Sequence, residues 1–223
     1  MVSAATVDPA REAEIVKLGR LLGREPASLG YLQRVPAGDI RVLRKLTNAA
    51  LFDNDSEVLK RLAAAGKLLP TGVVAAISER AFGPLLAARV AGVMEPKRAA
   101  DVGRQLDPTF LADVCVQLDP RAAGEIVPRM DLETVLAVTG ELLNRGDYVT
   151  LGRFVGAMPD NELAAILEIT EGDELVRVCA VAESPEGVGQ IFGMLSRERM
   201  ASLRQRASQK DLTQEARILR DRL

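Results

Sequence analysis

The apolar residues of this chain recur with a period of twelve over its middle part. Five blocks follow one another without a gap, at 83–94, 95–106, 107–118, 119–130 and 131–142. Within a block the apolar side chains occupy positions 5, 8, 9 and 12. This i, i+3, i+4, i+7 spacing is typical of one face of an α-helix. Each block is therefore expected to form one amphipathic helix of about ten residues, roughly 15 Å long.

A single continuous helix cannot carry this period. Twelve residues at 100° each turn about 1200°, which leaves the next apolar face roughly 120° away. The block boundaries provide the break, because position 1 is acidic in four of the five blocks and position 2 is Pro in four. An acidic side chain accepts hydrogen bonds from the free N–H groups of a helix start, and Pro fits the first turn. We interpret these acids as helix caps rather than a ladder of magnesium ligands: Glu95, Asp107, Asp119, Asp131 and Asp147.

The pattern resumes after a four-residue insertion at 143–146 and runs on to about residue 207. Helices this short are not stable alone and must stack on their neighbours, as they do in helical-repeat proteins. The sequence therefore predicts an all-α fold, an α-solenoid of short helices. We expect three regions: an N-terminal helical region at 1–82 that packs on the solenoid or forms a separate domain, the repeat domain at 83–207, and a basic C-terminal helix or tail at 208–223.

The N-terminal region is predicted to be helical but less regular. Asp8 and Gly23 are typical of the start and the stop of a first helix. Further helices are expected at 39–52, 55–65 and 71–81. In the second and third of these four helices the leucines expected to face inward are Leu43, Leu46, Leu59 and Leu62.

Part of the repeat resembles a known family. The stretch LDPTFLADVCVQLDPRAAGEIVPRMD resembles the N-terminal cytoplasmic domain of MgtE-type magnesium transporters, and the middle region of the flagellar motor switch protein FliG is similar in pattern. The resemblance covers roughly residues 83–207 and implies a right-handed superhelix. In the transporters magnesium binds between domains, so the resemblance also implies an ion response. Neither CBS domains nor membrane helices follow here.

Composition removes much of the enzyme repertoire. The chain has no histidine, which excludes histidine general bases, Ser–His and Cys–His pairs, and histidine-ligated metals. Cys115 and Cys179 both fall at position 9 of a block, so we expect buried, structural thiols. There is no secretory signal and no apolar run of about 18 residues. We therefore expect a cytoplasmic protein that is not an enzyme, is not inserted in a membrane and requires no cofactor.

The charge distribution suggests where contacts form. Residues 131–195 hold 3 basic and 12 acidic residues, whereas residues 196–223 hold 8 basic and 4 acidic ones. The two segments either attract each other within the fold or bind a partner. The side chains selected as partner contacts are Asp160, Glu162, Glu168, Arg204, Arg206, Arg217 and Arg220. The tail lacks interleaved aromatic residues, which disfavours nucleic acid as the partner.

A cluster of acids around Gly172 is the candidate metal site. Glu171, Asp173 and Glu174 offer the oxygen ligands that Mg²⁺ prefers, in an open and weak site. A solvated turn at a helix start explains the same residues. The function predicted from the sequence is a non-enzymatic, cytoplasmic protein-binding scaffold or regulatory module, with self-association through the tail as an option. The alternative is a stand-alone magnesium-responsive regulator.

Overall fold

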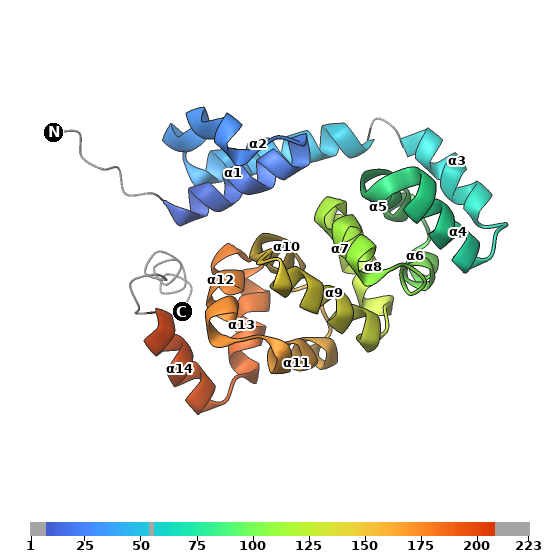
Figure 1. The fold of residues 1–223 in the computed structure, drawn as a ribbon. Helices are drawn as coiled ribbons and strands as arrows, with labels where there is room; N and C mark the ends of the chain where they lie inside the picture. The colour runs from blue at the N-terminus through green and yellow to red at the C-terminus, as the bar shows by residue number, and fades with distance from the viewer. Residues whose placement is uncertain (1–7, 54–55, 208–223) are drawn as a thin grey trace.

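The computed structural model describes residues 8–53 and 56–207, and every regular element within them is helical (Figure 1). The N-terminal elements are α1 (Pro9–Leu22), the 3₁₀ segment η1 (Pro26–Arg34), α2 (Ala37–Asp53), α3 (Ser56–Gly66), α4 (Thr71–Ile77) and the π-helical turn η2 (Ser78–Phe82). The repeat helices are α5 (Gly83–Val93), α6 (Pro96–Gly103), α7 (Pro108–Gln117), α8 (Pro120–Ile126) with the 3₁₀ turn η3 (Val127–Arg129), α9 (Leu132–Asn144), α10 (Tyr148–Phe154), α11 (Asp160–Ile169), α12 (Gly172–Val181), α13 (Pro185–Met194) and α14 (Arg197–Ala207). The all-α prediction is confirmed.

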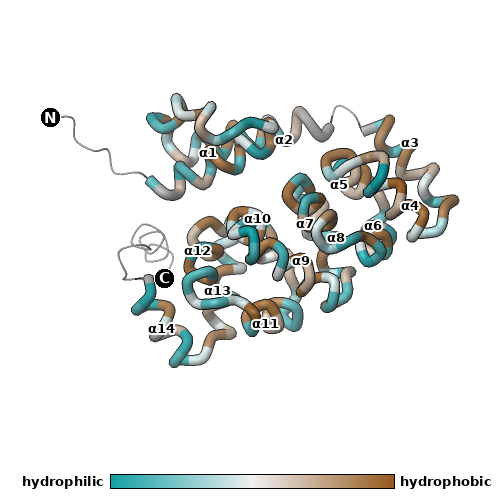
Figure 2. The backbone as a smooth tube through the Cα atoms, in the orientation of Figure 1, coloured by the Kyte–Doolittle hydropathy of each residue, from teal (hydrophilic) through white to brown (hydrophobic). Residues whose placement is uncertain are grey.

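Each block of the repeat forms one helix, and the predicted caps are confirmed. Asp107 accepts hydrogen bonds from the backbone N–H groups of Thr109 and Phe110, at 2.9 and 3.3 Å. The other four acids, Glu95, Asp119, Asp131 and Asp147, also accept from N–H groups of the first helical turn. Figure 2 shows hydrophobic and hydrophilic residues alternating along the repeat helices, as the period requires.

Helices two apart in the chain pack on each other and form two rows. One row runs α3, α5, α7, α9 and α11, and the other runs α4, α6, α8, α10, α12 and α14. One apolar core, with members from Leu59 to Leu203, joins the rows. This stacking is what a solenoid requires, because each short helix buries its apolar face against its neighbours. The right-handed sense implied by the family resemblance stays a prediction.

The first helices form a small unit of their own beside the rows. A separate apolar cluster holds Ile15, Leu18, Leu29, Leu32 and Ile40, from α1, η1 and α2. The apolar core thus divides between α2 and α3, not at the predicted boundary of 82 and 83, and α3 and α4 extend the two rows. The α1 helix also contacts α7 and α12, which places this unit against the repeats (Figure 1). Residues 208–223 lie outside the described part of the chain.

The predicted inward face of α2 is wrong. Leu43 and Leu46 are exposed, whereas Ile40 and Arg44 are buried. Burial of Arg44 is explained by Glu14 on α1, whose Oε2 lies 2.9 Å from the Arg44 Nε. Because α2 packs on α1 through this charged pair, the spacing of the apolar residues in α2 does not indicate which side of the helix is buried. Within the described residues no helix combines the length and the apolar character needed to cross a bilayer.

Candidate functional site

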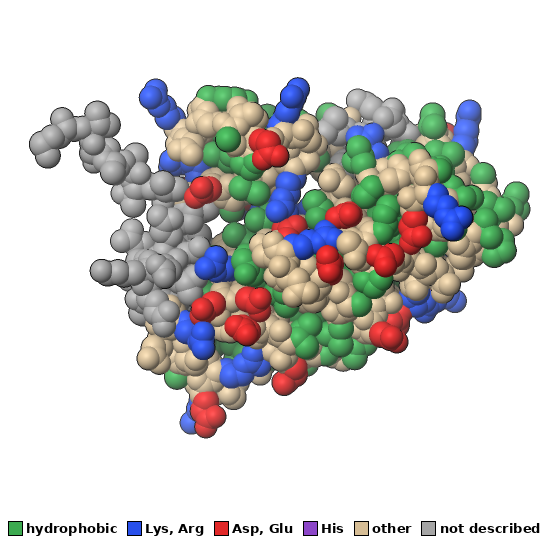
Figure 3. All heavy atoms as spheres, viewed as in Figure 1, with side chains coloured by type: hydrophobic (Ala, Val, Ile, Leu, Met, Phe, Trp, Pro, Cys, Tyr) green, Lys and Arg blue, Asp and Glu red, His purple; other side chains and the backbone are tan. Residues whose placement is uncertain are grey.

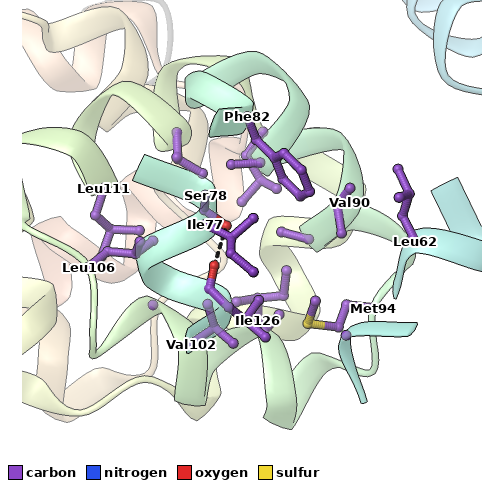
Figure 4. A pocket seen from close by; sticks show the side chains of 18 of the residues that line it. Leu62, Ile77, Ser78, Phe82, Val90, Met94, Val102, Leu106, Leu111 and Ile126 are labelled. Atoms are coloured by element: carbon purple, nitrogen blue, oxygen red, sulfur yellow. Dashed lines mark hydrogen bonds between the residues drawn. The ribbon is translucent and has the colours of Figure 1, made fainter. Parts of the chain in front are cut away.

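An apolar cavity lies near one end of the two rows, between α3, α4 and the repeat helices α5 to α8 (Figure 4). Its volume is about 190 Å³. An apolar cavity of about 150 Å³ stays dry and binds benzene. None of the described residues that line the cavity carries a charge, and the Ser78 hydroxyl already donates to the Val74 carbonyl oxygen at 2.9 Å. The cavity is therefore suited to an apolar group.

Small side chains at core positions create this space. The first two blocks carry small residues at positions 5 and 9, namely Ala87, Ala91, Ala99 and Gly103, and all four line the cavity. Most later blocks hold at least one larger residue at these positions, such as Leu111 in the third block. The sequence analysis did not identify this site, although the run of small residues at core positions is a signal that could have indicated it.

The mouth of the cavity is surrounded by exposed apolar residues. Three lining residues remain partly exposed at the rim, Leu62 at 38%, Leu69 at 39% and Ile77 at 36%. Val58 and Val73, one helical turn before Leu62 and Ile77, are also exposed. Figure 3 shows hydrophobic side chains gathered at the α3–α4 end of the molecule. Cavity and rim together form an apolar surface that continues outside the core, which we call the α3–α4 groove.

The predicted burial of both cysteines is confirmed. Cys115 lines the cavity, and burial raises the pKa of its thiol to about 12, although Arg153 opposes the shift. A thiol with a pKa raised this far stays protonated, and therefore unreactive, at pH 8.

We expect the native chain to show no reactive thiol towards Ellman's reagent at pH 8, and both thiols to react once urea unfolds the chain. Cys179 is fully buried, which keeps the reagent away from its thiol. Ser202→Cys provides an exposed positive control on α14, since Ser202 lies on the surface. Rapid labelling of one thiol in the native chain would contradict the closed packing around α7 or α12.

The three predicted metal ligands form a helix cap and an ion pair in this structure. Glu171 and Glu174 form a capping box at the start of α12, in which the Glu174 carboxylate accepts from the Glu171 N–H at 2.9 Å. Asp173 pairs with Arg206 on α14 at 2.8 Å. Within the described residues no group of three or more carboxylates or thiols is placed to hold a metal ion. The magnesium response stays a prediction.

An ion pair joins the acidic segment 131–195 to the described part of the basic segment 196–223. Arg206, selected as a partner contact, is the residue that pairs with Asp173. Asp160 accepts a hydrogen bond from the Gln190 side chain, and Glu168 is exposed on the same helix. Glu162 on α11 is buried and not available as a surface contact. Burial raises the pKa of its carboxyl group. Arg204 is exposed on α14.

Arg217 and Arg220 lie outside the described residues, so their predicted contacts stay predictions.

Searches against protein-family models, curated proteins and solved structures gave no match. The resemblance to the MgtE-type transporter domain therefore stays a prediction as well.

Proposed function

We propose that this chain is a non-enzymatic, cytoplasmic helical-repeat protein that binds another protein, and that the α3–α4 groove receives an amphipathic helix of that partner. The observation that supports this most is the uncharged 190 Å³ cavity opening onto exposed apolar residues. Apolar grooves in helical proteins bind helices through residues spaced at i, i+3 or i+4, and i+7. Large apolar anchors that fill such a pocket supply most of the binding energy.

The end of the two rows favours a helical occupant. The first helices of a helical-repeat array normally present a polar outer face, because no further repeat covers them. Here α3 instead exposes Val58 and Leu62, which lie one helical turn apart. The α4 helix likewise exposes Val73 and Ile77, one turn apart. A helix laid along this surface would continue the packing that α5 and α6 receive from α3 and α4.

The charges beside the groove indicate which charge the partner helix should carry. Residues 56–69 hold three basic side chains, Lys60, Arg61 and Lys67, and one acid, Glu57. Glu57 pairs with Lys60 at 3.2 Å, which leaves the positive charges of Arg61 and Lys67 in excess. We therefore propose an acidic amphipathic helix, whose carboxylates meet these side chains while its apolar anchors enter the cavity.

The proposal is tested by titrating the full chain with a short fluorescent peptide that has Leu at i, i+4 and i+7 and Glu elsewhere. We expect saturable binding, and an affinity about tenfold lower in either Leu62→Gln or Ile77→Gln, because each removes an anchor contact at the rim. Leu132→Gln is the matched control, since Leu132 is 40% exposed on α9 and does not line the cavity. This control should bind as tightly as the parent chain.

Two altered peptides make the result specific. Replacing the three Leu residues of the peptide by Ala should abolish binding, and replacing its Glu residues by Lys should weaken it. Equal affinity for the Leu and the Ala peptide would sink the proposal, as would equal losses in the rim variants and in the Leu132 control.

A further inference from the structure

A second pocket lies where the N-terminal unit meets the repeats, and basic side chains surround it. Five cationic residues from four helices line this pocket, Lys17, Arg20, Arg44, Arg89 and Arg153. None of the described residues that line it is acidic. Figure 3 shows the molecule hollowed between the α1–α2 unit and the repeats, with Lys and Arg side chains beside the hollow. Such a concentration of positive charge favours an anion.

Carboxylates behind the pocket pair with three of these cations, Lys17, Arg20 and Arg44. Glu183 lies 3.4 Å from the Lys17 Nζ and 3.1 Å from an Arg44 nitrogen, and Asp147 lies 2.6 Å from Arg20. Glu14 contacts Lys17 and Arg44 too, but it also pairs with Arg41, at 3.0 Å, outside the pocket. Each of these carboxylates is thus already engaged by a cation.

Arg153 has no carboxylate partner among the described residues. Its guanidinium donates to the carbonyl oxygens of Val116 and Leu118, at 2.9 and 2.6 Å. Its buried Nε has no hydrogen-bond partner within the described part of the chain. Glu183 and Asp119 oppose its charge only from beyond ion-pair distance. A buried cation that contacts no carboxylate directly is costly, so the site gains from an anion that binds it.

The pKa values of two cations in the pocket are lowered, chiefly by burial. Burial lowers the pKa of Arg153, and Arg44 and Arg20 lower it further against the opposing effects of Glu183 and Asp119. Burial likewise lowers the pKa of Lys17, although Glu183 and Glu14 oppose the shift. Both cations would be stabilised by a negative group placed between them.

The size of the pocket limits the ligand. Its volume is about 40 Å³. One water molecule needs about 10–15 Å³, so the space suits about three waters or one tetrahedral oxyanion. Guanidinium groups bind phosphate oxygens in pairs, and the side-chain amides of Asn48 and Gln117 add two further donors at the wall. We propose that this pocket binds a phosphate group, either as the free ion or at the end of a small ester.

A bound phosphate would connect the two parts of the fold. The pocket is lined from α1 and α2 on one side and from α5, α7 and α10 on the other. The ligand binds the folded arrangement only, so it should raise the melting temperature with concentration. This site is independent of the α3–α4 groove, whose lining shares only Leu118 with it.

The experiment measures the melting temperature and the binding heat of the full chain in sodium phosphate, against sodium chloride of equal ionic strength. Gln117→Glu places a carboxylate at the pocket wall with almost no change of shape. It should lower the phosphate affinity by at least about tenfold while leaving the phosphate-free melting temperature unchanged or higher. Arg153→Gln should lower the affinity as well. Gln105→Glu adds the same charge at an exposed position on the turn after α6 and should leave the response intact.

Two results would overturn the proposal: no saturable effect of phosphate over chloride, or a Gln117→Glu variant that responds like the parent chain. Phenyl phosphate distinguishes the two sources of the group. Binding at least as tight as that of inorganic phosphate supports an ester, and binding of inorganic phosphate alone supports the free ion. Phenol, which lacks the phosphate, should not compete with inorganic phosphate for the chain, and competition by phenol equal to that of phenyl phosphate would count against the site.

Discussion

Replacing Glu14 by Gln is expected to lower the free energy of unfolding by about 3–5 kcal/mol, the cost of breaking a buried ion pair from one side. The Glu14 side chain is 2% exposed, and its two oxygens lie 3.0 Å from the Arg41 Nε and 2.9 Å from the Arg44 Nε. Lys17 lies 3.7 Å away. Gln keeps the shape but removes the charge, so buried Arg44 and Lys17 would face each other with Glu183 as their remaining partner.

The measurement is urea unfolding of the full chain, because urea, unlike guanidinium, does not screen charges. Glu12→Gln is the matched control, since Glu12 is exposed on the same helix and should change stability by less than about 0.5 kcal/mol. Equal stabilities for the two variants would show that the carboxylate of Glu14 contributes nothing to holding α1, α2 and the repeats together.

The second large effect is expected from Gly187→Ala, at about 3 kcal/mol of destabilisation, the upper range for overpacking. A Cβ at Gly187 on α13 would lie 2.6 Å from the backbone nitrogen of Gly156 and 2.8 Å from its Cα. Backbone atoms cannot move aside as the end of a side chain does. Gly156 itself has φ +92°, a conformation that only glycine adopts readily, so the turn has little freedom to relax.

Gly189→Ala is the control for this change, because it makes the same substitution two residues further along α13. A Cβ at Gly189 meets no atom within 4 Å, so removing the flexibility of glycine from a helix interior should stabilise the chain by about 0.5–1 kcal/mol. Thermal and urea unfolding of both variants should therefore give shifts of opposite sign. Shifts of the same sign would contradict the close approach of α13 to the turn at Gly156.

The prediction was most accurate where the determining interactions are local. The limits of the repeat helices follow from the acid or Pro at the block boundaries, and Asp107 shows the expected hydrogen bonds to the next turn. The buried state of Cys115 and Cys179 follows from the apolar face of a single helix. The sequence was less informative about charge, because Arg206 and Asp173 look equally suited to a partner and to each other.

Thus the sequence by itself determined that the chain is all-α, where the repeat helices begin and which of their faces is buried. These features depend on residues within about one helix length of each other. Only the tertiary structure decided that α3 and α4 extend the rows, that the small residues leave a cavity, and that Arg44 rather than Leu43 is buried. Each of these depends on residues far apart in the chain, such as Lys17, whose Nζ donates to the Val181 carbonyl oxygen at 2.9 Å. The pattern of one helix specifies that it must pack, but not which helix it packs against or what space remains between them.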